Sequence, residues 1–220
     1  MTSNATFTEP RAAELADAAK AGDADRVREL VAAGADPNAR GAKGLTLLQW
    51  AMLSQQPAGV EALLAAGADP ARGSDDGQTA VHLAAQAERA VYLDLLLEHG
   101  ASPDTPNTVT GATPLVAALM AEREANFDAL LKAGARVDAA DRMGNTPLHQ
   151  AAKINESARV LQLLEAGADP QAKNGQGDTF QRYLFMTPDK ALSAQARRGN
   201  DQVRAWLRAH AIPIQDAATQ

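Results

Sequence analysis

The sequence contains no cysteine, few aromatic residues and no long apolar run. The absence of cysteine excludes disulfides and thiolate metal sites. No stretch of about 20 uninterrupted apolar residues is present, which excludes a membrane-spanning helix. Residues 1–7 lack a basic start and an apolar core, so they do not predict a secretory signal. Aromatic residues make up 4% of the chain, and alanine and leucine supply most of the 45% hydrophobic content, as expected of closely stacked helices.

Positive charge is also scarce, because 21 Lys and Arg stand against 27 Asp and Glu. The formal net charge of −6 argues against a nucleic-acid backbone as the main partner. The charge is uneven: residues 1–110 hold 8 basic and 15 acidic residues, whereas residues 111–220 hold 13 and 12. The acidic half is either a solvated face or a dipolar surface that orients a partner.

Recognisable catalytic motifs are missing. The four histidines do not pair with one another or with carboxylates at metal-ligand spacing, and His-Glu-x-x-His is absent. There is no Gly-x-Ser-x-Gly elbow and no phosphate-binding glycine loop in a strand–helix setting. We therefore expect no catalytic activity, no bound metal and no cofactor.

Two motifs recur through the chain in one register. Gly-Ala-Asp-Pro stands at 34–37, 67–70 and 167–170, and variants at 100–103 and 134–137 bring the glycine-to-glycine steps to 33, 33, 34 and 33 residues. A second motif begins with threonine at 46, 79, 113, 146 and 179. Two interlocked motifs at one period predict a stack of identical supersecondary units.

One unit, residues 144–176, shows how each repeat is expected to fold. Thr146 can cap a short inner helix, and Pro147 suits its first position. The polar residues 155–157 break that helix and can cap an outer helix with an apolar stripe. Gly167 ends the outer helix, because glycine accepts a left-handed backbone. The polar segment that follows is expected to project as a finger.

This pattern resembles the ankyrin repeat, whose Thr-Pro-Leu-His-x-Ala and Gly-Ala-Asp motifs are matched over roughly residues 11–213. The resemblance implies an all-α, ankyrin-repeat solenoid of helix–turn–helix units joined by β-turn fingers. It also implies that His82 and His149 hydrogen-bond to the backbone of a neighbouring loop. Trp50 falls at a position that is normally buried between repeats.

The expected organisation is a single domain over 11–213. It comprises an N-terminal cap (11–43), four repeats (44–76, 77–110, 111–143, 144–176) and an enlarged C-terminal cap (177–213), with tails at 1–10 and 214–220. The terminal repeats depart from the repeat motif, as capping repeats do. In the C-terminal cap, the bulky residues expected to cover the last repeat are Tyr183, Phe185, Trp206 and Leu207, with the Trp206 ring buried.

The resemblance also implies where a protein partner binds, because ankyrin proteins usually contact partners through finger tips and inner-helix positions. The finger candidates are Lys43, Leu45, Asp75, Asp76, Gln78, Val109, Arg142, Met143, Asn145, Gln176 and Asp178. The inner-helix candidates are Leu53, Gln86, Met120, Lys153, Ile154 and Met186. Seven of these are aliphatic or methionine, and an exposed apolar row is typical of an interface. Alternatively, several of them tuck under neighbouring fingers.

Three stretches, 45–51, 107–115 and 179–188, are similar to bacterial ankyrin-repeat immunity proteins of type VI secretion phospholipase effectors. That resemblance implies a protein that binds and neutralises an antibacterial lipase-type effector. It would act in the periplasm if a signal or lipoprotein leader has been removed, and in the cytoplasm otherwise. The alternative is a scaffold or accessory protein that binds a cellular enzyme without inhibiting it. Free of its partner, the protein is expected to be a monomer.

Overall fold

The structure is a computed structural model that describes residues 3–215. The chain forms two compact units, Met1–Gly134 (unit 1) and Ala135–Gln220 (unit 2). Within the described residues all regular elements are helices, and an isolated β-bridge joins Arg40 to Thr46. The all-α ankyrin fold expected from the motifs is therefore confirmed, whereas the single domain over 11–213 stays a prediction.

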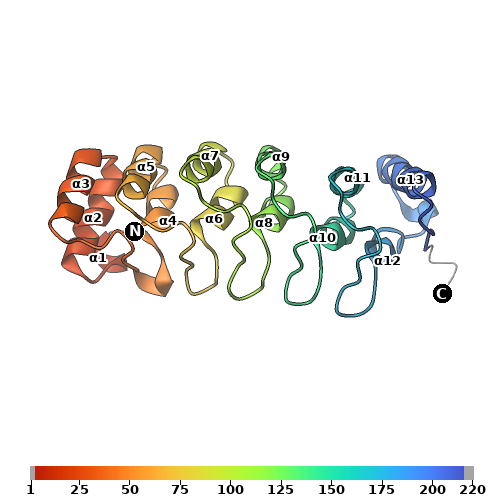
Figure 1. Cartoon of the computed structure of the whole chain (residues 1–220), viewed down its shortest axis with the longest axis horizontal. Helices are drawn as coiled ribbons and strands as arrows, with labels where there is room; N and C mark the ends of the chain where they lie inside the picture. Colours follow the sequence, from red (N-terminus) through yellow and green to blue (C-terminus); the bar gives the residue numbers. More distant parts are fainter. Residues whose placement is uncertain (1–2, 216–220) are drawn as a thin grey trace. The chain divides into compact units, whose positions relative to one another are not determined.

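Unit 1 consists of an N-terminal helix group followed by helix pairs whose connecting loops project to one side (Figure 1). The N-terminal group comprises α1 (Ser3–Thr6), α2 (Pro10–Ala21) and α3 (Ala24–Ala32). The inner helices are α4 (Leu47–Leu53), α6 (Ala80–Gln86) and α8 (Pro114–Met120), and a 3-10 turn, η1 (Ala42–Gly44), precedes α4. The outer helices are α5 (Pro57–Ala65), α7 (Val91–Glu98) and α9 (Glu124–Lys132).

The repeat motif fixes the ends of these helices. Thr46, Thr79 and Thr113 are the N-caps of the inner helices and have extended backbones. Gly67 and Gly100 follow the outer helices with φ of 90° and 78°, the left-handed conformation that glycine adopts without steric cost. The helices therefore begin and end where the threonine and glycine motifs predict.

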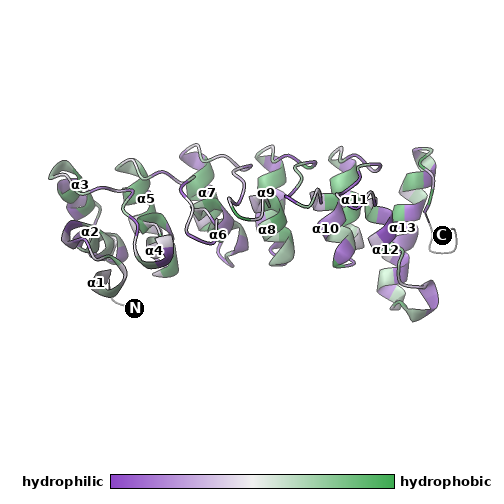
Figure 2. Ribbon diagram, turned by 90° about the horizontal axis from the view of Figure 1, so that it is seen from below, coloured by the Kyte–Doolittle hydropathy of each residue, from purple (hydrophilic) through white to green (hydrophobic). Residues whose placement is uncertain are grey.

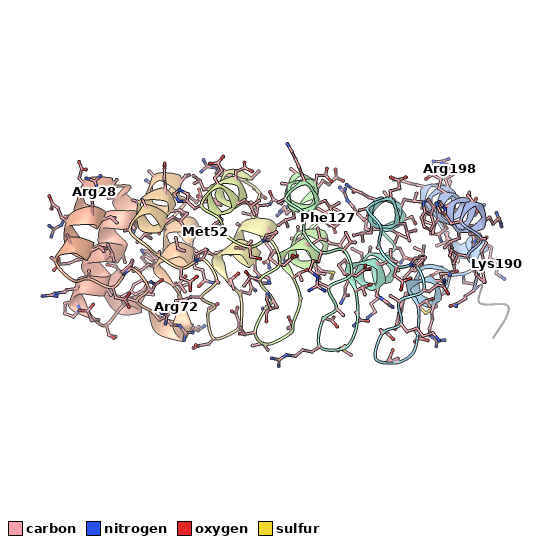
Figure 3. All side chains as sticks on the ribbon, in the orientation of Figure 1. Arg28, Met52, Arg72, Phe127, Lys190 and Arg198 are labelled. Atoms are coloured by element: carbon pink, nitrogen blue, oxygen red, sulfur yellow. The ribbon has the colours of Figure 1, made fainter. Side chains whose placement is uncertain are left out.

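The core of unit 1 lies between the two helix layers. The helices α5 and α7 are drawn largely in the hydrophobic colour in Figure 2, and their Leu63, Leu93 and Leu96 have no exposed surface. Phe127 on α9, labelled in Figure 3, is 1% exposed. Gly59 on α5 contacts the backbone of α2 so closely that a Cβ there would collide with the carbonyl of Ala19. A glycine at this position thus lets the first regular repeat pack against the N-terminal group.

The described part of the segment 1–10, expected as a tail, contributes to the core of unit 1 through Phe7. Phe7 is 2% exposed, and its ring meets the Trp50 ring edge-on at a centroid distance of 5.8 Å. The Trp50 indole N–H donates to the carbonyl of Ala16 at 3.2 Å, so the predicted burial of Trp50 is confirmed. The N-terminal end of the unit is therefore closed by aromatic and small apolar side chains.

Unit 2 contains one regular helix pair and the C-terminal cap. The pair is α10 (Pro147–Lys153) and α11 (Ser157–Glu165). The cap comprises α12 (Phe180–Leu184), the 3-10 turn η2 (Asp189–Ala191) and α13 (Ala194–Ala209), whose N-cap is Ser193. Thr187-Pro188 thus precedes only a short turn, and the last helix begins after Ser193.

The N-cap of α11 lies within the predicted segment 155–157, and the side chain of Ser157 is used for packing. The N-cap of α11 is Glu156, which makes no side-chain capping bond. The Ser157 hydroxyl instead donates to Asn200 Oδ1 of α13 at 2.7 Å, and Asn200 Nδ2 donates to the carbonyl of Leu184 at 3.3 Å. Gly199 makes this approach possible, since a Cβ there would lie 2.7 Å from Ser157 Cβ.

The last inner helix is covered by the chain that follows α13. Gln181 occupies a slot that holds Leu48, Leu115 or Leu148 in other repeats, yet it is 1% exposed. Its Nε2 donates to the carbonyl of Pro213 at 3.1 Å, and its Oε1 accepts from the Gln215 N–H at 2.9 Å. A polar side chain at this position is therefore satisfied by the backbone of residues 213–215.

The bulky residues of the C-terminal cap are only partly as expected. Phe185 and Leu207 are buried, at 3% and 0% exposure. Trp206, expected to be buried, is instead partly exposed, and its ring stacks on His210 at a centroid distance of 3.8 Å. Its position on α13 places it beside a residue one turn later on the same helix rather than in the core.

Candidate protein-interaction surface

The fingers of unit 1 are bonded to one another through their backbones. The Asp75 N–H donates to the Lys43 carbonyl at 3.0 Å, and the Thr108 N–H donates to the Gly77 carbonyl at 3.2 Å. Asn107 adds a side-chain link, because its Nδ2 donates to the carbonyl of Asp76 at 3.2 Å. These hydrogen bonds fix the spacing between neighbouring fingers of unit 1.

The two aspartates predicted as finger-tip contacts are exposed but already make internal bonds. Asp75 accepts from Arg40 at 3.0 Å. Asp76 accepts from the hydroxyl of Ser74 and, at 3.1 Å, from the N–H of Gln78. The Ser74 hydrogen bond holds the pKa of Asp76 below its ordinary value. The Asp76 carboxylate therefore remains charged at neutral pH, and both aspartates contribute to finger conformation.

One predicted contact residue of unit 2, Asn145, is buried at 3% exposure, so its selection as a surface contact was wrong. The Asn145 amide donates to Asp141, and its Oδ1 accepts from Lys153 Nζ at 2.7 Å and from Asn174 Nδ2 at 3.0 Å. The repeat register places Asn145 in a finger, where residues are usually exposed, and the register contains no information about these hydrogen bonds. Asn145 therefore holds the side chains of Lys153 and Asn174 in place and does not itself contact a partner.

Lys153 is exposed and is held in place by two neighbours. Its ammonium lies 4.8 Å from the centroid of the Tyr183 ring and bonds to Asn145. The Tyr183 hydroxyl in turn accepts from Asn174 at 2.8 Å and donates to Gln176 Oε1 at 3.1 Å. A positive charge is therefore fixed on the inner-helix side of unit 2.

The histidines of the repeat motif bond to neighbouring loops as predicted. His82 Nε2 lies 3.0 Å from the carbonyl of Ala112, and His149 Nε2 lies 2.9 Å from that of Asp178. A carbonyl only accepts, so Nε2 carries the proton and Nδ1 accepts from the capping threonine. Burial lowers the pKa of both rings, which favours this neutral form.

Two of the repeats fill the histidine slot differently. Gln49 reproduces the imidazole contacts, because its Oε1 accepts from the Thr46 N–H at 3.0 Å and its Nε2 donates to the Gln78 carbonyl at 2.8 Å. Val116 has no polar atom to offer, and the hydroxyl of Thr113 is accordingly buried without a partner. Glutamine is therefore a natural substitute for histidine at this slot, and valine is not.

The exposed apolar side chains occupy a restricted set of positions. Among the described residues, the large hydrophobic side chains classed as exposed all belong to the set predicted from the repeat register. They are Leu53 (60%), Val109 (51%), Met120 (52%), Met143 (67%) and Met186 (65%). Leu45 and Ile154 are only partly exposed, and Ile154 is the C-cap of α10.

Gln78 and Gln86 also lie at predicted contact positions, and both are partly exposed. They bond to each other, with Gln86 Nε2 donating to Gln78 Oε1 at 3.4 Å. The remaining predicted contacts, Lys43, Arg142 and Gln176, are exposed on the fingers, and Asp178 is partly exposed. Each unit therefore presents polar finger tips beside exposed apolar inner-helix residues.

Sequence reasoning did not single out two buried oxygens of the outer helices in unit 1. The Tyr92 hydroxyl on α7 and Asn126 Oδ1 on α9 are inaccessible to solvent and have no hydrogen-bond partner. The amide nitrogen of Asn126 is well satisfied, because it donates to the carbonyls of Ala84, Ala85 and Ala87. The two residues occupy the same position of the outer helix in their repeats, and the residue at that position differs from repeat to repeat. The repeat motif therefore does not predict them.

Within 3–215, no cluster of histidine and carboxylate side chains is arranged to hold a metal ion. None of the helices in this part of the chain combines the length and the apolar character needed to cross a bilayer.

Comparisons with known proteins agree with this geometry. The family model described as ankyrin repeats (3 copies) matches residues 15–107 and 93–174, so the chain belongs to the ankyrin-repeat family. Its repeats form a protein–protein interaction module, and the fold is typically a non-catalytic binding scaffold.

Two individual proteins resemble the chain. Protein PhlB from Serratia liquefaciens is 50% identical over 131 residues, which are 60% of this chain and 53% of PhlB, so the chain spans about half the length of that relative. The crystal structure of the ankyrin repeat domain of Bcl-3, a member of the IkappaB protein family, superimposes with a TM-score of 0.70 at 30% identity. That match covers 85% of this chain and 81% of the Bcl-3 chain.

Proposed function

We propose that this protein is a non-catalytic binding module that captures and neutralises a lipase-type effector. The observation that carries the proposal is the confinement of the exposed large hydrophobic side chains to finger and inner-helix positions. Apolar anchors surrounded by polar residues supply most of the energy of protein interfaces. The polar residues here include Lys43, Asp75 and Gln176 on the fingers.

The identity of the partner rests on the similarity to type VI immunity proteins over 45–51, 107–115 and 179–188. The 50% identity to a bacterial protein, PhlB, supports a bacterial setting. Neutralisation would follow from occupying the active site or lid of the lipase. The second candidate function, a scaffold that binds an enzyme without inhibiting it, is favoured by the same surface and differs only in its effect on the partner.

The test takes the protein encoded beside this gene, asks whether it is of the lipase type, and measures its binding to this chain together with its hydrolysis of a fluorogenic phospholipid. Met120→Asp tests unit 1 and Met186→Asp tests unit 2, since each places an unpaired charge at an exposed apolar position. Each should weaken binding by about 100-fold, or roughly 2.7 kcal/mol. Ala65→Asp on α5 and Ala158→Asp on α11 are matched controls, because both alanines are exposed on outer helices.

Three outcomes separate the candidates. Stoichiometric loss of lipase activity that both methionine variants prevent supports neutralisation. Tight binding with undiminished hydrolysis supports the scaffold. An absence of binding to the lipase, or equal loss of binding in the alanine controls, rules out this partner or this surface.

A further inference from the structure

The turn between α6 and α7 differs from its equivalents. Gln55, Glu122 and Asn155 have φ near 57° at the corresponding turns, in the left-handed region. In the second repeat Ala87 is extended instead, with φ −70° and ψ 150°, and α7 begins only at Val91. Residues 87–90 therefore follow a separate path, and a cleft lies on each side of them.

The first cleft has a volume of about 550 Å³ and is walled by aliphatic side chains. Met52 and Leu53 come from α4, and Leu83 comes from α6. Tyr92 also lines this cleft, is 4% exposed and has a hydroxyl without a hydrogen-bond partner. Glu88 and Arg89 are the exposed charged residues at its edge.

The second cleft, of about 310 Å³, shares Ala87 and Glu88 with the first. Asn126 lines it, is 2% exposed, and its Oδ1 has no donor. Glu122 and Glu124 also line this cleft. Arg123 lies among them, but its Nε donates to the Gln86 carbonyl at 3.0 Å and its Nη2 is 3.8 Å from Glu88.

Together the clefts offer an apolar space beside buried oxygens that need a donor. A buried oxygen without a partner costs free energy that a ligand N–H can recover. The charge of unit 1 selects the sign of that ligand, because residues 1–134 hold 10 Lys and Arg against 18 Asp and Glu. An acidic unit with unfilled acceptors favours a ligand that carries cationic N–H groups.

We propose that these two clefts receive a segment of a partner protein in which an aliphatic or aromatic side chain lies next to an arginine or lysine. The apolar side chain fills the space between Leu53 and Leu83. Its entry uncovers the Tyr92 and Asn126 oxygens, which are closed to solvent in the free chain, so that they accept N–H groups of the segment. The proposal rests on the proposed function only in requiring a protein partner. The site lies at the end of the inner helices, where the helix-to-helix turns are, and not at the finger tips.

The probe is a phage-displayed library of random 12-residue peptides, selected on the immobilised full chain and counter-selected on Leu53→Asp. Selected peptides should contain Leu, Ile, Met or Phe within two positions of Arg or Lys. Their Kd should rise at least 10-fold in Leu53→Asp and stay unchanged in Ala158→Asp, which adds the same charge to an exposed residue of the outer helix α11 in unit 2. Failure to enrich such peptides, or enrichment of acidic ones, overturns the proposal.

Tyr92→Phe separates a ligand-binding hydroxyl from one that merely holds water. The variant removes one oxygen and keeps the ring, so the melting temperature should not fall. The Kd of a selected peptide should nevertheless rise about 3- to 10-fold. An unchanged Kd overturns the role of the hydroxyl. These readouts do not involve the lipase, so peptide binding without lipase inhibition would reject the proposed function alone.

Discussion

The two ends of the molecule close their repeats by different physical means. At the N-terminal end, in unit 1, Phe7 and Trp50 bury aromatic surface against alanine-rich helices. At the C-terminal end, in unit 2, Phe185 and Leu207 are also buried, but Gln181 and Asn200 add buried polar side chains whose amides bond to backbone or side-chain partners. Apolar closure gains free energy in proportion to the area removed from water, whereas polar closure mainly avoids unsatisfied groups.

This difference shows that the exposed face of a terminal repeat can be covered either by apolar side chains or by polar side chains whose hydrogen bonds are satisfied. It also predicts different responses to truncation. An apolar end should lose stability through cavities, and a polar end through oxygens and N–H groups left without partners. Because each unit holds one of the two tryptophans, Trp50 and Trp206, fluorescence can follow each end separately.

The largest effect is expected from Phe7→Ala at the N-terminal end. Removing a fully buried ring should lower the free energy of unfolding by about 3–5 kcal/mol. Urea denaturation followed by the fluorescence of Trp50, in a Trp206→Phe background, measures this. Phe7→Leu is the control and should retain most of the stability. A midpoint unchanged by the alanine variant would show that α1 is not part of the folded end.

The polar end should respond less strongly, and its partners should be coupled. Asn200→Ala leaves the Ser157 hydroxyl and the Leu184 carbonyl unsatisfied, at a cost of about 1–3 kcal/mol. Adding Ser157→Ala to Asn200→Ala should cost less than Ser157→Ala alone costs in the original chain, because the orphaned hydroxyl is removed. Strict additivity in this double-mutant cycle, measured by urea denaturation, would contradict the hydrogen bond.

Acid should weaken both units through one histidine each. Burial lowers the folded pKa of His82 and His149 below the ordinary value of 6.5, so the unfolded chain binds more protons below that pH. Their contribution is therefore fully present above about pH 6.5 and is lost as the pH falls toward the folded pKa. Asp76, whose pKa is lowered from 3.8, acts only in a more acidic range.

The matched variants are His82→Gln and His149→Gln, because Gln49 already makes the equivalent bonds. Each should retain most of the stability at pH 7.5 and reduce the loss of stability between pH 7 and pH 5. Urea midpoints across this range measure the slope for each variant. A slope that neither substitution changes would mean that other groups control the acid response.

The smallest effect is expected from Trp206→Ala. Its ring is partly exposed and stacks on His210, so the loss should be about 0.5–1.5 kcal/mol, the range for an aromatic pair. Thermal melting followed by circular dichroism measures it, with His210→Ala as the companion variant. A loss above about 3 kcal/mol would place the ring in the core after all.

The architecture could be predicted from the sequence because threonine caps and helix-ending glycines act on their own backbone. Thr146 and Gly167 require only local geometry, so their spacing defines the repeat. His149 could also be placed, since its bonds recur in each repeat that keeps the motif.

The residues whose surroundings the sequence did not reveal depend on neighbours that do not repeat. Ser157 bonds to Asn200, which exists only in the cap, and Asn145 accepts from Lys153 and Asn174, a combination found in one repeat. Tyr92 lines a cleft because one turn is extended. Trp206 is adjacent to the buried Leu207 on α13, and the sequence alone does not specify which of two neighbouring bulky residues reaches the core.

The contact of Gln181 with residues 213–215 bears on how such an array can gain repeats during evolution. A duplicated repeat placed after α12 would have to displace Pro213 and Gln215 and would meet a buried amide where an apolar surface is required. Duplication between Thr46 and Thr179 would meet leucine or valine at that slot instead. The array should therefore lengthen from within, and its C-terminal cap should be inherited as a block.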